Sequence, residues 1–370
     1  MKKRITFFAF AAALAFCYSC SNDETVATND NAASNEISFR PLMNSVTRAF
    51  TEVTTTTMQT NGFYAVAYNS SDNSQYFAPE LFNVFSSSEY RASAPHYWPS
   101  TGNLDFIAYY PNVDAQFTHP TWNTFTLSPA DDVSTHNDYV VAATINQTKA
   151  SSTTGVPLHF KHLGSQIILK AYNSKGNANM KVTVTGWKIG YISKSGTYTF
   201  ATSTATASDI TAPTITSGSQ KTENVPNAYS QTVSSATYSG ETYDTSGEAV
   251  QIGTPVIIVP QTVTPFNSTS TYSTDGYLPG AFIGVKLLIQ DSSDHTLADA
   301  TTDGVWAAWP ITNSWVAGTK YTYTIDLAQG GYKEKKTEGE TVEPWLSGAE
   351  IFFSSVDVTP WVETAGSAAM

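Results

Sequence analysis

Hydrophobic and polar residues alternate along most of the chain with the period of two that is typical of β-strands. The clearest case is TKYTYTIDL at residues 319–327, where Tyr321, Tyr323 and Ile325 share one face and the intervening polar residues share the other. No long helical period competes with this pattern. Because such strands need a second sheet to cover them, the pattern predicts an all-β sandwich architecture. Similar runs, separated by turn residues, are FYAVAY (63–68), LDFIAYYP (104–111), TFTL (124–127), YVVAATI (139–145), KVTVTGWKIGYI (181–192), GTYTF (196–200), TPVIIVP (254–260) and GAFIGVKLLIQ (280–290).

The strand runs divide into two groups near residue 163. In VPLHFKHLGSQIILKAYN (156–173), Gly164 and Ser165 interrupt two apolar runs, which is where a chain passes from one domain to the next. A chain of 370 residues is long enough for two domains. We therefore expect one domain over residues 49–163 and another over residues 164–370. The Thr/Ser-rich segment 201–248 has weak hydrophobicity, and we expect a long loop there.

The first residues do not fit this strand pattern. MKKRITFFAFAAALAF combines a basic start with a short apolar run, which predicts an export signal over residues 1–19. The run is short for a spanning helix, and Ser19 precedes Cys20 as a small residue does in bacterial lipoprotein signals. Cys20 is thus the candidate for lipidation, and an ordinary secretory signal is the alternative, since Cys17 stands where such signals usually have an apolar residue.

Residues 20–48 are expected to form a polar tether followed by one strand. The tether SNDETVATNDNAASN (21–35) is small and polar. In EISFRPLMNSVTRAF (36–50), an imperfect alternation containing Pro41 predicts an edge strand. Its apolar residues are Ile37, Phe39, Leu42 and Met43.

Composition and charge narrow the classes of function. Charged residues make up 14% of the chain and aromatic residues 13%, which suits a β-rich extracellular protein. The two cysteines, Cys17 and Cys20, both precede the tether and the strands, so the folded part has no disulfide, thiol nucleophile or cysteine metal site. The net charge is −12, and nucleic acid is therefore an improbable partner. SNDE at 21–24 resembles the acidic surface-export tag of Bacteroidetes lipoproteins, which implies the outer face of the outer membrane.

No residue pattern predicts an enzyme or a cofactor. The chain has no nucleophile elbow, phosphate loop or dinucleotide fingerprint. His159 and His162 would point to opposite faces of a strand, so a shared metal is disfavoured. Asp131 and Asp132, followed by His136 and Asp138, are interpreted as turn chemistry rather than a polar site. For HYWP (96–99) and the Tyr109–Tyr110 pair, core packing is favoured over a sugar-stacking platform.

Seven blocks in order resemble the fimbrillin-like proteins of the Bacteroidetes. The most specific is PHYWPSTGNLDFIAYYP (95–111), and segment 201–248 is not covered by the resemblance. The resemblance implies two transthyretin-like β-sandwich domains in series, export as a surface lipoprotein, and assembly into fimbriae that support adhesion. The other blocks are DYVVAAT (138–144), VPLHFKHLGSQIILKAYN (156–173), VTGWKIGYISKSGTYTF (184–200), TPVIIVPQ (254–261), WVAGTKYTYTIDL (315–327) and EIFFSSVDVTPW (350–361).

The assembly route of the fimbrillin-like family implies that the first strand is removed and replaced. An arginine-specific protease cuts behind the N-terminal strand, the strand leaves, and a strand of another subunit replaces it. The chain has four arginines, Arg4, Arg40, Arg48 and Arg91, and Arg40 precedes a proline. Arg48–Ala49 is therefore the expected cleavage site. Release of the four apolar residues of the strand would vacate about 6–12 kcal/mol of apolar burial.

Several alternatives stay open at this point. The first strand is permanent if Arg48 lies in an ordinary loop, as in a tip or anchor subunit. A monomeric glycan-binding lipoprotein is a rival function, and an enzyme ranks last. The donor strand is not identified, because EIFFSSVDVTPW (350–361) suits either a donor or a core strand of the second domain.

Overall fold

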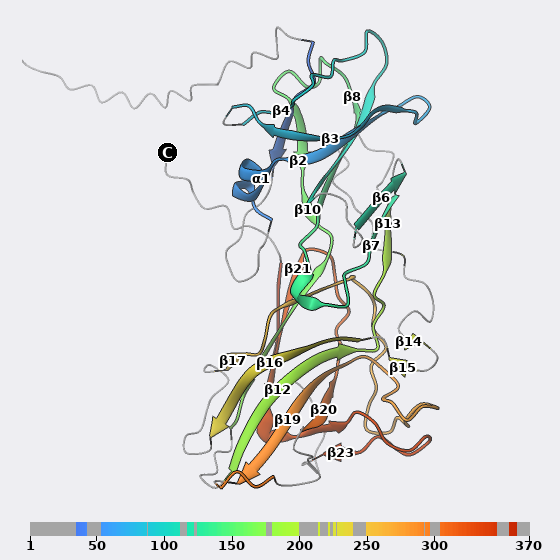
Figure 1. Ribbon diagram of the computed structural model, residues 1–370. Helices are drawn as coiled ribbons and strands as arrows, with labels where there is room; N and C mark the ends of the chain where they lie inside the picture. Colours follow the sequence, from blue (N-terminus) through green and yellow to red (C-terminus); the bar gives the residue numbers. More distant parts are fainter. Residues whose placement is uncertain are drawn as a thin grey trace, which may run out of the picture.

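The computed structural model describes residues 35–42, most of 53–345, and 355–360. Within the long range, it leaves out 87, 112–116, 122–123, 175–179, 200–213, 215–220, 223–224, 227, 240–248, 292 and 297–303. Its regular secondary structure is almost wholly β-strand, with one α-helix, α1 (Thr55–Asn61), and the 3-10 turns η2 (Val133–Thr135) and η4 (Leu327–Gln329). The all-β prediction is confirmed (Figure 1).

The first half of the chain forms an eight-stranded sheet. Its order is β10-β8-β5-β2-β3-β4-β1-β9, and all pairs are antiparallel except β1 with β9. One face buries a core that includes Phe63, Phe82 and Phe106. The strands are β1 (Phe39–Leu42), β2 (Phe63–Asn69), β3 (Gln75–Val84), β4 (Tyr90–Ala92), β5 (Leu104–Tyr110), β8 (Val140–Gln147), β9 (Val156–His159) and β10 (Lys161–His162).

Two further sheets come from the second half. A five-stranded sheet runs β17-β11-β21-β24 with β18 also on β11, and a six-stranded sheet runs β16-β12-β19-β20-β22-β23. Both contribute to a single core, for example Leu169 and Tyr323 from the first sheet and Trp187 from the second. This is the sandwich that the alternation predicts. The strands are β11 (Ser165–Tyr172), β12 (Met180–Gly190), β16 (Ala228–Ser239), β17 (Val250–Gln251), β18 (Val256–Ile258), β19 (Phe282–Asp291), β20 (Val305–Pro310), β21 (Thr319–Asp326), β22 (Gly331–Lys333), β23 (Pro344–Trp345) and β24 (Ser355–Pro360).

Strand β16 corrects the expectation of a loop over residues 201–248. It pairs antiparallel with β12 along nearly its whole length, and the register shifts between Val184 and Gly186. Two short strands, β14 (Lys221–Thr222) and β15 (Val225–Pro226), pair with each other in the same segment. Thr/Ser-rich sequence forms β16 because the neighbouring strand β12 supplies a continuous row of main-chain partners.

A small sheet joins the two halves of the chain. Strand β13 (Gly196–Thr199) pairs with β7 (Thr124–Leu127), which pairs with β6 (Phe117–Thr121). Side chains from both halves form one buried cluster here, including Tyr109, Phe125, Tyr198 and Val259. The rings of Phe125 and Tyr198 are stacked, with centroids 5.2 Å apart. In Figure 1 this sheet lies beside β10, between the eight-stranded sheet and the sheets of β12 and β21.

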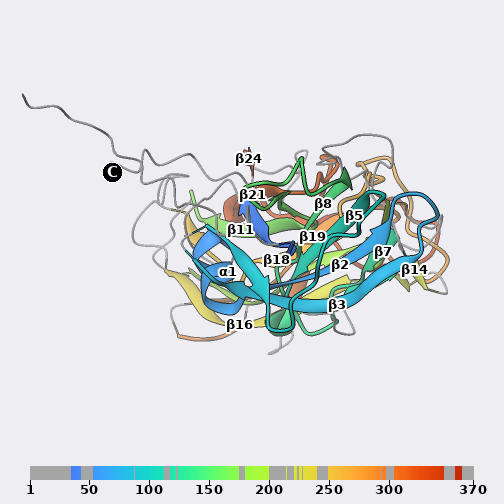
Figure 2. The same cartoon turned by 90° about the horizontal axis from the view of Figure 1, so that it is seen from above.

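Helix α1 lies beside the eight-stranded sheet, as both views show (Figures 1 and 2). Threonine is a weak helix former, but Thr54 and Thr57 form a reciprocal capping box at its start. Met58 is fully buried and anchors the helix on the sheet. The sequence analysis missed this helix, because seven residues are too few to show a helical period. Among the described residues, no helix has the length and apolarity needed to cross a membrane.

Candidate functional site at the N-terminal strand

The N-terminal strand β1 lies inside the eight-stranded sheet, between β4 and β9, and is not the edge strand that its sequence predicts. Ser38 and Leu42 accept hydrogen bonds at their carbonyls from Val156 N (2.8 Å) and Phe160 N (3.0 Å). These carbonyls face β9, so the backbone nitrogen of Pro41 faces the β4 side. Pairing with β4 ends at Phe39, so the missing N–H of Pro41 interrupts no ladder.

The residues before β1 are paired as well. Ile37 N donates to His96 O (2.7 Å), and Trp98 N donates to Asn35 O (2.8 Å). The side-chain amide of Asn35 returns a hydrogen bond to Trp98 O (3.0 Å). The N-terminal segment 35–42 is therefore bound by main-chain contacts on both sides.

The side chains of this segment fill the core of the first half. Ile37 is 1% exposed and Phe39 0%. The Phe39 ring packs edge-on against Phe82 (4.6 Å), Phe106 (5.1 Å) and Phe63 (6.0 Å). Leu42 is only half-buried, and Met43 lies outside the described residues. The burial that two fully enclosed side chains provide is about 3–6 kcal/mol, less than four such residues would give.

A charged contact holds the start of the segment. The Arg91 side chain, from β4, lies 3.4 Å from the Glu36 carboxylate and 2.9 Å from that of Glu89. Its guanidinium also lies 3.8 Å from the centre of the Phe85 ring. Only 14% of the Arg91 side chain is exposed, so it is largely enclosed. The sequence analysis had given Arg91 no role.

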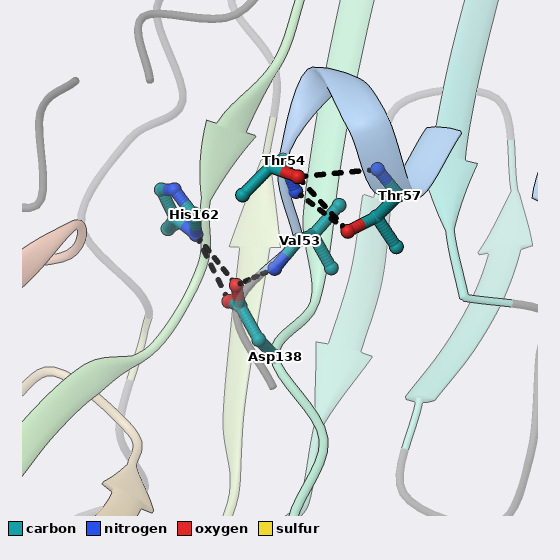
Figure 3. A network of polar contacts seen from close by, with 5 residues as sticks. All are labelled: Val53, Thr54, Thr57, Asp138 and His162. Atoms are coloured by element: carbon teal, nitrogen blue, oxygen red, sulfur yellow. Dashed lines mark hydrogen bonds and ion pairs between the residues drawn. The ribbon is translucent and has the colours of Figure 1, made fainter. Parts of the chain in front are cut away.

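A second polar network fixes the chain at Val53, eleven residues beyond Leu42 at the described end of β1 (Figure 3). The buried carboxylate of Asp138 accepts from Val53 N (2.9 Å), and His162 Nδ1 lies 2.9 Å from both of its oxygens. Thr54 and Thr57, which open α1, follow directly. The chain is thus firmly held on both sides of residues 43–52. The sequence analysis considered Asp138 and His162 separately; their pairing joins residues 24 positions apart and has no local signal.

The predicted processing and lipidation residues, Arg48, Ala49 and Cys20, lie outside the described residues. Arg48 and Ala49 fall between the end of β1 at Leu42 and the start of the next described stretch at Val53. The other arginine near the strand, Arg40, is part of β1, and both Arg40 and Pro41 are paired with β9.

Among the described residues, the C-terminal strand β24 pairs with β21 alone and lies at an edge of the five-stranded sheet. Val358 is on the same face of the sheet as its partner Tyr321, which is buried, yet Val358 is 49% exposed. Asp357 and Thr359 are exposed too. The described part of β24 is therefore bound by one neighbour and weakly covered.

The other candidates for chemistry resolve into structural roles. Asp132 accepts from Ser134 N (3.0 Å) at the start of η2, which is turn chemistry as interpreted. His136 is buried between Ala130 O (2.8 Å from Nε2) and Ile257 N (3.1 Å from Nδ1), and burial lowers its pKa. His159 is exposed whereas His162 is buried. Within the described residues, no group of three His, Cys, Asp or Glu side chains could hold a metal ion.

The aromatic residues of HYWP (96–99) and of the Tyr109–Tyr110 pair lie partly in the core and partly at the surface. Trp98 is buried and packs edge-on against Phe106 (5.6 Å), and Tyr109 is buried, so core packing is confirmed for both. Tyr97 is 51% exposed, and Tyr76 donates from its hydroxyl to Tyr97 O (2.8 Å). The His96 side chain pairs with the Glu80 carboxylate, and its ring stacks on that of Phe77 with centroids 4.2 Å apart.

This architecture is similar to that of a solved fimbrial protein. That protein, from Bacteroides vulgatus, shares the fold, with a TM-score of 0.53 at 15% identity over 88% of this chain and 99% of that chain. Two other solved structures are less similar. A candidate cell adhesion protein from Bacteroides uniformis has a TM-score of 0.42 at 15% identity over 88% of this chain and 98% of that chain. The tip fimbrial protein Mfa3 from Porphyromonas gingivalis has a TM-score of 0.37 at 10% identity over 88% of this chain and 100% of that chain. No curated protein matches the chain in sequence.

The sequence profile of the fimbrillin-like family matches residues 47–345. The match includes segment 201–248, which the resemblance of individual blocks had left uncovered, and it begins immediately before the predicted cleavage site. The chain belongs to the fimbrillin-like family.

Proposed function

We propose that the chain is a structural subunit of a surface fimbria that is assembled by exchange of β-strands. The observation that carries the proposal is the position of β1. This strand is paired on both sides and buries Phe39 completely, yet it connects to the rest of the chain only through residues 43–52. Cutting the Arg48–Ala49 bond would turn an internal strand into a separate peptide. A vacated position inside a sheet is a template for a strand from another subunit.

The proposal includes the export and anchoring that the sequence predicts. The signal over residues 1–19 directs export, Cys20 carries the lipid, and residues 21–35 tether the folded part to the outer membrane surface. We also propose that residues 49–163 and 164–370 are two transthyretin-like domains. Two of the three buried clusters support this division: the core around Phe39 draws on residues 37–160, and the sandwich core draws on residues 167–345 plus Val133. The third cluster, which includes Phe125 and Tyr198, lies where the two halves meet. Other fimbrial subunits are the partners, and no catalytic role is proposed.

Strand β24 is our candidate for the incoming strand. It lies near the C-terminus, pairs with a single neighbour, and half-exposes Val358 on the inward face. Releasing it would open only the edge of the five-stranded sheet. This favours the donor interpretation of residues 350–361 over the core interpretation.

The test uses purified precursor and an arginine-specific endoprotease. We expect the wild-type chain to lose the residues before Ala49 and to form ladders on a gel that collapse on heating. The matched variant Arg48→Lys keeps the positive charge but removes the recognition residue, and it should stay monomeric. A wild-type chain that is cut at Arg48 without forming polymers would contradict strand exchange.

A second candidate function is glycan binding through the exposed side chains of Tyr76 and Tyr97, which are linked by a hydrogen bond from the Tyr76 hydroxyl to Tyr97 O. Exposed aromatic rings are suited to stack on a sugar. Under this alternative, Tyr97→Ala would abolish retention on immobilised glycans while protease treatment leaves a monomer. Retention that is equal in Tyr97→Ala and wild type would exclude the site.

A further inference from the structure

The bond Arg91–Ala92 has the same two residues as the proposed processing site Arg48–Ala49. The bond lies between two contacts with the N-terminal segment. Phe39 pairs with Tyr90, just before the bond, and Ile37 N donates to His96 O, five residues after Arg91. Only Ser38 of the segment lies between these two points, opposite residues 91–95, and Arg91 and Ala92 remain paired with β3. Ser93, Ala94 and Pro95 are exposed, so the backbone just after the bond is already at the surface.

In the uncut chain, the Arg91 side chain is withheld from a protease. An arginine-specific endoprotease must bind the extended guanidinium in its own pocket. Here the guanidinium lies between the carboxylates of Glu36 and Glu89 and against the Phe85 ring, with 14% of the side chain exposed. Glu36 belongs to the N-terminal segment, so the segment itself contributes to this enclosure.

We propose that Arg91–Ala92 is a second cleavage site for an arginine-specific endoprotease, which the N-terminal segment shields and its release opens. The inference rests on the proposed function, because release follows cleavage at Arg48. Hydrolysis consumes one water and leaves a carboxylate on Arg91 and an α-amine on Ala92. A strand from another subunit that takes the place of β1 restores the shield.

The departure of the segment removes three restraints at once. Tyr90 loses its partner Phe39, His96 and Trp98 lose their main-chain bonds, and Arg91 loses the Glu36 carboxylate. The three-residue strand β4 then keeps only its pairing with β3. Short edge strands open locally at low cost, and proteolysis of such sites follows the population of the opened state.

Cleavage at Arg91 would remove the subunit from assembly. It separates β2 and β3 from β5 in the chain and cuts the strand against which an incoming strand pairs. Subunits that gain a new strand are protected, whereas processed subunits that remain empty are cut. The second site thus selects against unassembled subunits.

The experiment compares four full-length chains under limiting amounts of an arginine-specific endoprotease. They are wild type, the single variant Arg48→Ala, the double variant Arg48→Ala/Phe39→Ala, and the triple variant Arg48→Ala/Phe39→Ala/Arg91→Ala. Mass spectrometry and N-terminal sequencing follow the appearance of a chain that starts at Ala92. Circular dichroism establishes that each variant is folded, and Arg48→Ala/Glu36→Gln replaces the Phe39 variant if that chain does not fold.

We expect cleavage at Arg91 in wild type only after cleavage at Arg48, and protection in Arg48→Ala. Loosening the segment by Phe39→Ala should raise the rate at Arg91 by about 100-fold without any cut at residue 48. The Arg91→Ala chain should yield no product starting at Ala92. Adding a synthetic peptide of residues 35–42 to the processed wild-type chain should slow the second cut.

The outcomes separate the two proposals. Equal rates at Arg91 in wild type and Arg48→Ala would overturn the shield. An intact Arg91 in processed chains that remain monomeric, or in the folded, loosened variants, would overturn it as well. If wild type is never cut at Arg48 but the loosened variants are cut at Arg91, the shield stands and the processing role of Arg48 is wrong.

Discussion

Replacing Phe39 by alanine tests whether the N-terminal strand stabilises the first half of the molecule. Phe39 is completely buried, and its ring contacts Phe63, Phe82 and Phe106. Truncating such a side chain removes its transfer free energy and leaves a cavity, which costs about 3–5 kcal/mol. Native domains have a free energy of unfolding of about 5–15 kcal/mol. Phe39→Ala should therefore remove a large fraction of the stability.

The matched control is Phe85→Ala, the same chemical change at a ring that is 56% exposed. Phe85 contributes its contact with the Arg91 guanidinium, worth about 0.5–1 kcal/mol at an exposed site. Urea unfolding by circular dichroism measures both losses. Hydrogen exchange at Val156 and Phe160, whose amides bind the β1 carbonyls, shows whether the loss is located at the strand. Equal shifts for the two variants, or unchanged exchange at Val156 in Phe39→Ala, would refute the reasoning.

Three further predictions follow from contacts in the structure. Asp138→Ala removes the carboxylate that accepts from Val53 N and pairs with buried His162. The free energy of unfolding should fall by about 1–3 kcal/mol for each of these two contacts, which a lower urea midpoint would show. Gly155→Ala places a Cβ at a φ of +85° against the backbone of β1, which should cost about 1–3 kcal/mol and speed exchange at the strand. Burial lowers the pKa of His136 from 6.5, so the unfolded chain binds the proton more readily and stability falls as the pH drops below this value. In His136→Asn, this part of the pH dependence should vanish from thermal unfolding curves; an unchanged slope would exclude His136 as its source.

The sequence predicted the strands wherever one face is apolar. In β21, the alternation places Tyr321, Tyr323 and Ile325 in the core, as expected. Its other face is less exposed than the pattern suggests, because Asp326 is buried and accepts from Ser174 N (3.0 Å). Alternation identifies which residues share a face, but only the neighbouring chain decides whether the polar face is covered.

The sequence did not predict which strands pair. The parallel partner of β1 is β9, more than a hundred positions away, and Pro41 misleadingly indicated an edge strand. Strand β16 was expected to be a loop, since its serines and threonines carry little hydrophobic signal, and it forms through main-chain pairing with β12. Both errors have one cause: the free energy of these strands comes from partners distant in sequence.

The candidate site was predicted only in part. Phe39 in β1 and Ile37 just before it are buried as the first strand requires, whereas Leu42 is half-buried. The Glu36–Arg91 and Asp138–His162 contacts, which hold the segment before and after the predicted cleavage site, had no signal in the sequence. Side-chain pairs of this kind depend on the register of the sheet, and that register is set by the whole fold.

The most direct test of strand exchange is the N-terminal sequence of this protein in polymers sheared from the surface of cells that produce it. Cleavage at Arg48 predicts a chain that begins at Ala49, with residues 20–48 absent from the polymer. Polymers whose subunits begin at Cys20 and retain the N-terminal strand would contradict the account.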